Sequence, residues 1–363
     1  MCSEHDTESV SMTPAAWKKI LAIQIKQMGD VLLTTPAVRC LRRAFPDAQI
    51  DFAVQSNIAV IVEDNPDINN LVIVNPKSGF FDYVSFLRSV RRTGYDAVFD
   101  FIGTPRSAVI ARVSGAPVRY GFDFDGRKFA YTHVVQRDRS PKYEVDYKFD
   151  LLRGAGIACA ELDLVLGVND AARARAAEIF RELGLDAPGA RGKGVILLSP
   201  ISRRQARRWH ITSYARLASL AADAGFVCVA VTGPGEEQMG EEIVRGSGGR
   251  ALMLPPTSVK EMAACFALAD ATVANDNGPM HISMAVGTPT IAIFGPTKPE
   301  SWMEPGGRHR WLKGNVPCIG CEKQECNEMI CMTDVTPEAV LAVVREVCAG
   351  QTETTAPESN RTR

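Results

Sequence analysis

Short apolar runs alternate along the chain with segments that carry apolar side chains at helical spacing. In the first half, the runs predict strands over residues 20–25, 50–54, 71–74 and 97–102, and the spacing predicts a helix over 83–92. Strands that alternate with helices are typical of a parallel sheet covered by helices on both faces. The first half is therefore predicted to be an α/β layer structure.

The same alternation begins again after residue 170. Asp170 is the predicted cap of a helix over 171–183, which Gly184 terminates. Strands are then expected over 194–199, 227–232, 252–254 and 271–274, and helices over 212–224, after Pro234 and over 259–268. Two halves of similar size predict an α/β fold of two doubly wound domains that face each other across a cleft.

The composition of the two ends sets the outer limits of these domains. Residues 1–16 are predicted to be a disordered N-terminal extension, and the polar residues 349–363 a disordered tail. The two domains are predicted to span 17–169 and 170–348.

Length, composition and net charge narrow the possible classes of protein further. The 363 residues are 46% hydrophobic and 23% charged, a soluble globular profile with room for two domains. The net charge of −1 provides no basic field, so no nucleic-acid partner is expected. No apolar run approaches the roughly 20 residues of a membrane span, and the polar start MCSEHDTESV lacks the features of a signal peptide. A cytoplasmic protein is predicted.

The first candidate site residues follow the first strand, where ligands bind in open α/β sheets. In IKQMGDVLLTTP (25–36), Pro36 suits the first position of a helix capped by Thr35. Gly29 and Asp30 are then left in or near the turn at the cleft. The Asp30 carboxylate has the chemistry to take a proton from an incoming hydroxyl, or it caps a helix. Both interpretations stay open.

A cluster of arginines follows the first strand of the second half, in SPISRRQARRW (199–209). Its members are Arg203, Arg204, Arg207 and Arg208. Guanidinium groups match phosphate oxygens in pairs, which favours an anion site at this strand end. The alternative is a solvated basic turn.

The next strand of the second half is followed by TGPGEEQ (232–238). Gly235 would allow a ligand close to the backbone, and Glu236 or Glu237 would accept hydrogen bonds from sugar hydroxyls. The alternative is an ordinary helix whose acidic residues lie at its positive end.

The stretch NDNGPMHISMAVGTPTIAIFGPT (275–297) contains a helix of barely two turns between two buried strands. Gly278 and Pro279 begin this helix, and its free N–H groups and dipole form an anion site. Asp276, Asn277 and His281 surround that site. The alternative for His281 is a buried histidine with a structural hydrogen bond.

Four cysteines lie within fourteen positions, at spacings x2, x4 and x4. They are Cys318, Cys321, Cys326 and Cys331. Four thiolates suit tetrahedral zinc or an iron–sulfur cluster. The favoured alternative is a compact surface loop with reduced or locally paired thiols.

Several other classes of protein are excluded by the motifs that are missing. No Gly-x-Gly-x-x-Gly follows a strand, and the chain has no Walker loop, no His-Glu-x-x-His and no Gly-x-Ser-x-Gly. Dinucleotide-dependent redox chemistry therefore has no support, and no cofactor is expected.

Four motifs, in this order, resemble the lipopolysaccharide heptosyltransferases of glycosyltransferase family 9. They are GDVLLTTPA (29–37), RRW (207–209), NDNGPMH (275–281) and FGPT (294–297). The resemblance covers residues 20–347, nearly the whole globular part. It implies the GT-B fold of two Rossmann-like domains, with the donor site in the second.

The resemblance also implies an activity. It is the metal-independent transfer of a heptose from ADP-heptose, with inversion, to the inner core of lipopolysaccharide, on Kdo-lipid A or heptosyl-Kdo-lipid A. The acceptor would place the enzyme at the inner face of the inner membrane. Arg39, Arg42 and Arg43 are candidates for contact with lipid or acceptor phosphates, or form a solvated helix face.

The resemblance assigns roles to Asp30, to Arg207 (where the family usually has a phosphate-contacting lysine) and to Asp276, Gly278 and His281, and the other candidates that follow strands complete the expected site. Asp30 is the expected base, and Gly29 and Thr34 lie on the acceptor side. The expected donor-binding residues are Ser202, Arg207, Arg208, Gly235, Glu236, Asp276, Asn277, Gly278, Pro279 and His281. The chain departs from the family at Asn277, where threonine is common, and at His210, where proline is common. A relative that uses another nucleotide sugar, or a non-catalytic nucleotide-sugar-binding protein, therefore remains an alternative.

Overall fold

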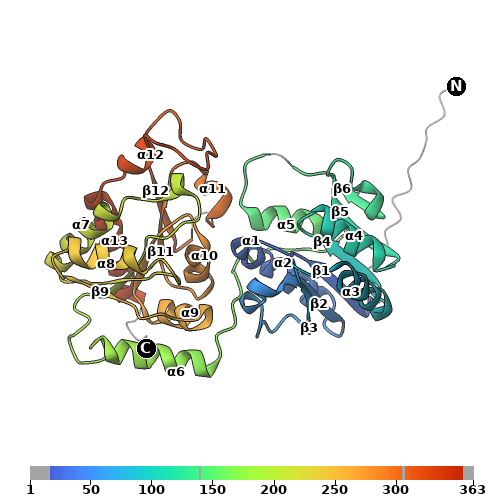
Figure 1. Cartoon of the computed structure of the whole chain (residues 1–363), viewed down its shortest axis with the longest axis horizontal. Helices are drawn as coiled ribbons and strands as arrows, with labels where there is room; N and C mark the ends of the chain where they lie inside the picture. Colours follow the sequence, from blue (N-terminus) through green and yellow to red (C-terminus); the bar gives the residue numbers. More distant parts are fainter. Residues whose placement is uncertain (1–16, 139, 305–306, 355–363) are drawn as a thin grey trace, which may run out of the picture.

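The computed structural model describes residues 17–138, 140–304 and 307–354 (Figure 1). The predicted disorder of 1–16 lies outside the described residues. The predicted tail begins too early, because helix α13 (Pro337–Thr354) continues through 349–354. Val340, Val344 and Cys348 bury one face of this helix, and the polar residues that follow extend it.

The first half contains a six-stranded parallel sheet in the order β3-β2-β1-β4-β5-β6. Its strands are β1 (Lys19–Ile23), β2 (Gln49–Gln55), β3 (Asn70–Val74), β4 (Ala97–Asp100), β5 (Val118–Phe122) and β6 (His133–Val135). Its helices are α1 (Met28–Leu32), α2 (Thr35–Ala44), α3 (Phe80–Thr93), α4 (Pro105–Val113) and α5 (Glu144–Arg153), with 3₁₀ turns η1 (Ser56–Ile61) and η2 (Lys128–Ala130).

The second half contains another six-stranded parallel sheet, in the order β12-β11-β10-β7-β8-β9. Its strands are β7 (Val195–Ser199), β8 (Val227–Ala230), β9 (Ala251–Met253), β10 (Ala271–Asn275), β11 (Thr290–Phe294) and β12 (Arg310–Lys313). Besides α13, its helices are α6 (Asp170–Glu182), α7 (Ile211–Asp223), α8 (Glu237–Gly246), α9 (Val259–Leu268), α10 (Gly278–Ala285), α11 (Pro299–Trp302) and α12 (Ile330–Thr333), with the 3₁₀ turn η3 (Gln205–Arg207).

Both sheets have the same strand order when each is numbered from its own first strand. That order, 3-2-1-4-5-6, is the doubly wound one, and it reverses direction between the first and fourth strands. Ligands bind at such a reversal, which lies beside β1 and β4 in one half and beside β7 and β10 in the other. The predicted fold class, α/β with two doubly wound Rossmann-like domains across a cleft, is confirmed.

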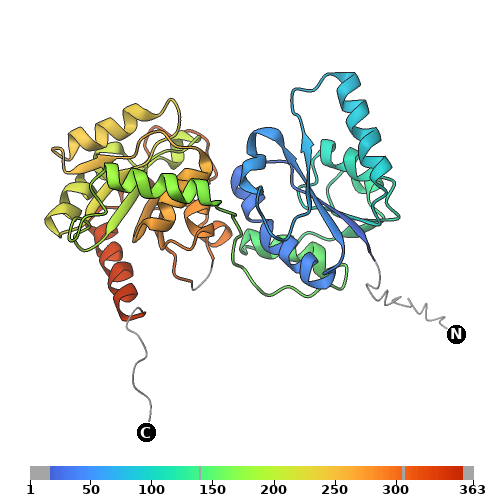
Figure 2. The same ribbon diagram turned by 90° about the horizontal axis from the view of Figure 1, so that it is seen from below.

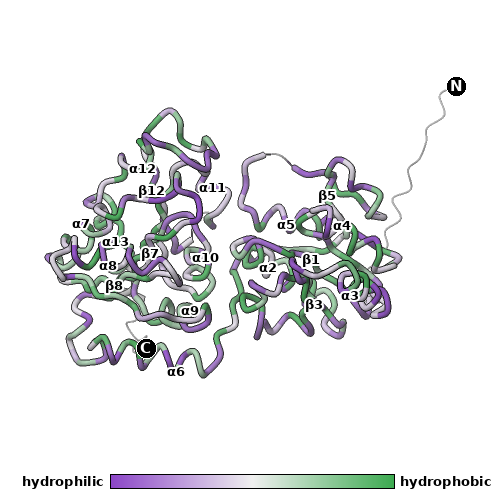
Figure 3. The backbone as a smooth tube through the Cα atoms, in the orientation of Figure 1, coloured by the Kyte–Doolittle hydropathy of each residue, from purple (hydrophilic) through white to green (hydrophobic). Residues whose placement is uncertain are grey.

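Apolar positions gather in the strands of both sheets, and polar positions dominate outer helices such as α3 (Figure 3). All residues of β7, β10 and β11 are buried, which explains why their apolar runs were recognisable. The edge strand β12 was not predicted, because its residues Arg310, Trp311 and Lys313 are exposed and form no apolar run.

The helix starts near the cleft differ from their predictions. A separate short helix, α1, precedes α2, and Thr34 rather than Thr35 is the N-cap of α2. Gly29 and Asp30 therefore lie in the first turn of α1 and not in a loop. In the second half, Asn169 and not Asp170 caps α6, since its side chain accepts a hydrogen bond from the N–H of Ala172.

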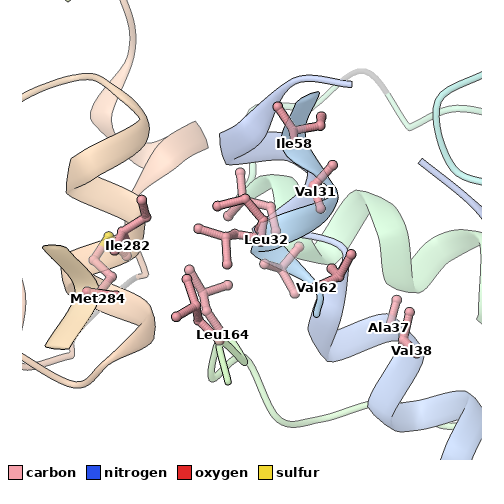
Figure 4. Packing of buried hydrophobic residues seen from close by; sticks show 14 of the residues in the cluster. Val31, Leu32, Ala37, Val38, Ile58, Val62, Leu164, Ile282 and Met284 are labelled. Carbon is pink, nitrogen blue, oxygen red and sulfur yellow. The ribbon is translucent and has the colours of Figure 1, made fainter. Parts of the chain in front are cut away.

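The two halves share one apolar cluster where α1 meets α10. Figure 4 shows Leu32 of α1 between Val31 and the side chains of Ile282 and Met284 of α10, with Leu164 of the connecting segment nearby. All five are buried. This contact fixes the strand-end loops of one half opposite those of the other.

A buried lysine adds a polar link between the halves. Lys260 of α9 donates a hydrogen bond to the carbonyl of Glu63 at 2.6 Å and lies 3.4 Å from the Asp64 carboxylate. It also donates to the carbonyl of Gly167 in the connecting segment. No described helix is long and apolar enough to cross a membrane.

Candidate functional site

A hollow of about 390 Å³ lies between the two halves, at the strand ends where the topology predicts a ligand site. Ten of the predicted site residues line it: Gly29, Asp30, Ser202, Arg207, Glu236, Asp276, Asn277, Gly278, Pro279 and His281. Residues that are as far apart in the sequence as Gly29 and His281 thus line one space. This space is called the interdomain hollow below.

Three predicted residues do not line the interdomain hollow, and each has another contact. Thr34 is fully buried, and its hydroxyl donates to the backbone carbonyl of Asp30 at 2.8 Å. Arg208 turns away, because its Nε donates to the carbonyl of Ser202 at 2.7 Å. Gly235 lies in an exposed turn with φ of 82°, and its N–H donates to the Glu237 carboxylate at 3.0 Å.

Sequence reasoning missed other residues that line the interdomain hollow. Gln27 and Met28 come from the start of α1, and Trp302 comes from α11. Trp302 follows β11 and the FGPT stretch, so the rule that ligands bind after strand ends could have identified it. Gln27 and Met28 belong to the turn whose glycine and aspartate were already singled out.

A buried ion pair forms the floor of the interdomain hollow. The Arg207 Nη1 and Asp276 Oδ2 atoms are 2.7 Å apart, and the two side chains are only 13% and 4% exposed. Thr297 donates a further hydrogen bond to the Asp276 carboxylate at 2.5 Å. Burial raises the pKa of Asp276 and Arg207 opposes that rise, while burial lowers the pKa of Arg207.

Arg207 retains capacity to bind a ligand in this arrangement. Its buried Nε has no hydrogen-bond partner among the described residues. A buried donor without an acceptor is unfavourable, so an acceptor supplied by a ligand would stabilise it. Asp276 therefore holds and orients the guanidinium, which can face a ligand anion.

Two asparagines connect the start of α10 to the arginine segment. The Asn277 side chain caps α10 by accepting from the N–H of Met280 at 2.8 Å, and its Nδ2 donates to the carbonyl of Ile201 at 2.6 Å. Buried Asn275, which was not among the predicted residues, accepts from the N–H of Trp209 at 3.0 Å. Its Nδ2 donates to the carbonyl of Pro200 at 2.6 Å. The positive end of α10 and the arginines are thereby held in one geometry.

His281 packs across the cleft against α1. It is 3% exposed, and burial, together with the charge of Arg207, lowers its pKa to about 3. A Cβ atom added to Gly29 would lie 2.7 Å from His281 Cδ2, so only glycine allows this approach. His281 is therefore neutral at neutral pH, and its Nδ1 has no partner among the described residues.

A second hollow, of about 190 Å³, lies within the first half and is called the N-terminal hollow below. Its lining residues are Gln24, Asp30, Phe101, Ile102, Phe122, Phe124, Arg137, Glu144, Tyr147 and Lys148. Asp30 is the one residue that also lines the interdomain hollow. A carboxylate therefore stands where the two spaces meet.

A buried charge pair lies beside Asp30 in the N-terminal hollow. Lys148 is 4% exposed, and its Nζ lies 3.3 Å from Glu144 Oε1 and 3.3 Å from the carbonyl oxygen of Phe101. Burial raises the pKa of Asp30, Lys148 opposes that rise, and Glu144 adds to it. The capping role that sequence left open is also present but weak, with the N–H of Gln27 3.4 Å from Asp30 Oδ2.

The four cysteines of 318–331 line one small hollow of about 90 Å³. In the described parts of the chain, no three histidine, cysteine or acidic side chains are arranged to hold a metal ion. The segment instead supports the arginine segment, because the Gln205 side chain accepts from the N–H of Cys326 at 3.0 Å. The N–H of Ala206 also donates to the carbonyl of Gln324 at 3.2 Å. This geometry fits the structural interpretation of these cysteines.

The two doubly wound domains and the cleft between them have the GT-B architecture. The family model for glycosyltransferase family 9 (heptosyltransferase) matches residues 83–331, and the chain belongs to this family. The chain is therefore an enzyme of the family that builds the lipopolysaccharide core, and the resemblance inferred from the four motifs is confirmed.

Two relatives and two solved structures illustrate the similarity. The chain is 27% identical to lipopolysaccharide heptosyltransferase 3 of Escherichia coli K12, over 76% of this chain and 81% of that protein. It is 26% identical to lipopolysaccharide heptosyltransferase 1 of Pseudomonas aeruginosa PAO1, over 85% and 87%. A family 9 glycosyltransferase from Veillonella parvula superposes with a TM-score of 0.80 at 22% identity, covering 92% of this chain and 97% of that one. ADP-heptose lps heptosyltransferase II of E. coli superposes with a TM-score of 0.76 at 21% identity, covering 92% and 99%.

Proposed function

We propose that the protein transfers a heptose from ADP-heptose, with inversion and without a metal ion, to the inner core of lipopolysaccharide. The acceptor would be Kdo-lipid A or heptosyl-Kdo-lipid A. The observation that carries the proposal is the position of Asp30, between the interdomain hollow and the N-terminal hollow. Solved relatives of the same fold are described with ADP-2-deoxy-2-fluoro heptose and with ADP, which supports a nucleotide-sugar donor.

The interdomain hollow suits the donor. The start of α10 offers N–H groups and a positive dipole end, and Arg207 offers the unpartnered Nε. A diphosphate placed between them would receive hydrogen bonds from both. Glu236 is available to accept hydrogen bonds from sugar hydroxyls.

The N-terminal hollow suits the acceptor. An acceptor hydroxyl beside Asp30 would attack the anomeric carbon from the side opposite the diphosphate, which inverts that centre. The new carbon–oxygen bond forms as the bond to the diphosphate breaks, the hydroxyl proton passes to Asp30, and ADP leaves with the bonding electrons. Arg207 and the α10 start stabilise the negative charge that develops on the leaving diphosphate.

The direct test is ADP release by the purified full-length chain, given ADP-heptose and a truncated core acceptor. Acceptor-dependent release supports the proposal. A panel of nucleotide sugars in a thermal-shift assay tests the alternative that Asn277 marks a different donor, because the true donor raises the melting temperature most. A raised melting temperature without any ADP release would favour a non-catalytic nucleotide-sugar-binding protein.

Removing the charge of Lys148 or of Glu144, which both lie beside Asp30, is predicted to shift the pH profile of kcat/KM in opposite directions. The base must be ionised, so kcat/KM is expected to fall as pH drops through the raised pKa of Asp30. Lys148→Met removes the charge that lowers this pKa and moves the acid limb to higher pH. Glu144→Gln removes the charge that raises it and moves the limb to lower pH.

The pH profile of kcat/KM for the acceptor, obtained from ADP release at subsaturating acceptor and saturating donor, checks this prediction. Lys142→Met is the matched control, because Lys142 also pairs with a carboxylate, Asp138 at 3.1 Å, but does not line the N-terminal hollow. Shifts of the same sign in Lys148→Met and Glu144→Gln would show a general structural effect, and they would contradict the assignment.

A further inference from the structure

Two phenylalanines at the start of α3 are exposed to solvent. Phe80 and Phe81 are 76% and 84% exposed, and their rings are 5.6 Å apart. No other two consecutive large apolar residues are exposed in the described parts of the chain. Figure 2 shows that the turn into α3 projects outward from the first half. Two aromatic side chains thus occupy a protruding tip without packing into the fold.

The exposed face of α3 that includes Phe81 also carries positive charge, further along the helix. Phe81, Ser85, Arg88 and Arg92 recur at spacings of four, three and four residues, so they lie on one face, and all four are exposed. Arg88 and Arg92 form no ion pair with any described residue. Within α3 three arginines outnumber the single acidic residue, Asp82.

The opposite face of α3 packs on the sheet. Val90 is buried, and Phe86 and Leu87 are packed against the apolar cluster that contains it. The helix is therefore anchored by one face and presents the other, with the two rings at its end and the arginines beyond them. Lys77, in the turn before the helix, is also exposed.

We propose that this surface, formed by Lys77, Phe80, Phe81, Arg88 and Arg92, docks on an anionic lipid bilayer. The two rings would enter the boundary between headgroups and acyl chains, where aromatic side chains are favourable, and the cations would contact lipid phosphates. The inference rests on the proposed function in one respect, because the acceptor proposed for the enzyme is a lipid anchored in a membrane. The N-terminal hollow, which would bind this acceptor, lies in the same half of the chain as α3.

Two features favour a lipid surface over a protein partner. The apolar part consists of two side chains on a convex tip, whereas protein interfaces centre on a larger apolar patch. Arg88 and Arg92 lie on the same helix face as Phe81 and form no ion pair with a described residue, and such cations complement the negative surface of an anionic leaflet.

The arginines of α2, considered for this role from sequence, have partners within the fold. Arg42 Nη1 donates to the carbonyl of Pro46 at 2.9 Å, and Arg39 lies 3.6 Å from the Asp67 carboxylate. Arg43 pairs with Glu161 at 2.5 Å. These three arginines already have acceptors or carboxylate partners within the first half. Helix α3 is therefore the stronger candidate for contact with a lipid surface.

Cosedimentation of the full-length chain with lipid vesicles tests the proposal, without donor or acceptor present. Wild type is expected to bind vesicles that contain phosphatidylglycerol, and Phe80→Ser/Phe81→Ser is expected to weaken binding about tenfold or more. Arg88→Gln/Arg92→Gln is expected to weaken it to a degree that added salt reproduces in wild type. Phe129→Ser is the matched control, because Phe129 is 66% exposed in the same half but outside α3.

The possible results separate this proposal from the proposed function. ADP release with a water-soluble acceptor lacking acyl chains should be unchanged in Phe80→Ser/Phe81→Ser. The docking proposal is overturned if the wild-type protein does not bind vesicles that contain phosphatidylglycerol, or if it binds pure phosphatidylcholine vesicles equally well. It is also overturned if Phe129→Ser weakens binding as much as Phe80→Ser/Phe81→Ser does. A dimer in ultracentrifugation that dissociates in Phe80→Ser/Phe81→Ser would assign the tip to a second copy of the chain instead.

Discussion

Asp30→Asn is expected to lower kcat for heptose transfer by about 10²–10⁴-fold, the usual contribution of a positioned base. The amide has the shape of the carboxylate and can still accept the weak hydrogen bond from the N–H of Gln27. It cannot take the proton of the acceptor hydroxyl, so the loss should fall on the chemical step. Single-turnover ADP release at saturating donor and acceptor measures this step.

Stability provides the internal control for Asp30→Asn. Because burial disfavours the ionised carboxylate, a neutral amide should leave the melting temperature unchanged or raise it. Asp146→Asn is a suitable comparison, since Asp146 is a carboxylate of α5 that does not line the N-terminal hollow. If Asp30→Asn keeps wild-type turnover, Asp30 is only a capping residue of α1, and the base must be sought elsewhere.

The parts of the cleft that sequence predicted share one physical origin. Parallel strands end at one edge of their sheet, so polar residues after β1, β7, β8 and β10 must lie near one another within each half. This reasoning predicted that Asp30, Arg207, Glu236 and Asp276 lie at the cleft, although long stretches of chain separate them. The buried strands were recognisable because apolar runs of that length are rare elsewhere.

The N-terminal hollow was not predictable in the same way. Apart from Asp30, its residues come from α5, from β5 and from the segments that follow β1, β4, β5 and β6, and none of these belongs to a motif. Lys148 is spaced like any exposed lysine of an amphipathic helix, and only the packing of α5 on the sheet buries it beside Glu144. The exposure of Phe80 and Phe81 was not predictable either, because the predicted helix began at residue 83, whereas α3 begins at Phe80.

Arg207→Met is expected to reduce both the stability of the protein and its affinity for the donor. It leaves the Asp276 carboxylate buried with Thr297 as its remaining hydrogen-bond donor, and breaking a buried pair in this way costs about 3–5 kcal/mol of unfolding free energy. It also removes a charged hydrogen-bond donor to the diphosphate, which should weaken ADP binding by about 10–10²-fold. Denaturant unfolding and calorimetric titration with ADP measure the two effects separately.

The double variant Arg207→Met/Asp276→Leu separates the two roles of this arginine. Removing both charges relieves the unpaired buried carboxylate, so most of the lost stability should return, while ADP affinity stays low. Arg216→Met is the matched control, because Arg216 pairs with Glu338 at 3.5 Å on the exposed surface, where such a pair contributes about 0–1 kcal/mol. Recovery of ADP binding in the double variant would mean that Arg207 serves only to neutralise Asp276. The positive charge facing the diphosphate would then have to come from the start of α10 and from Arg203 or Arg204, which line the same hollow.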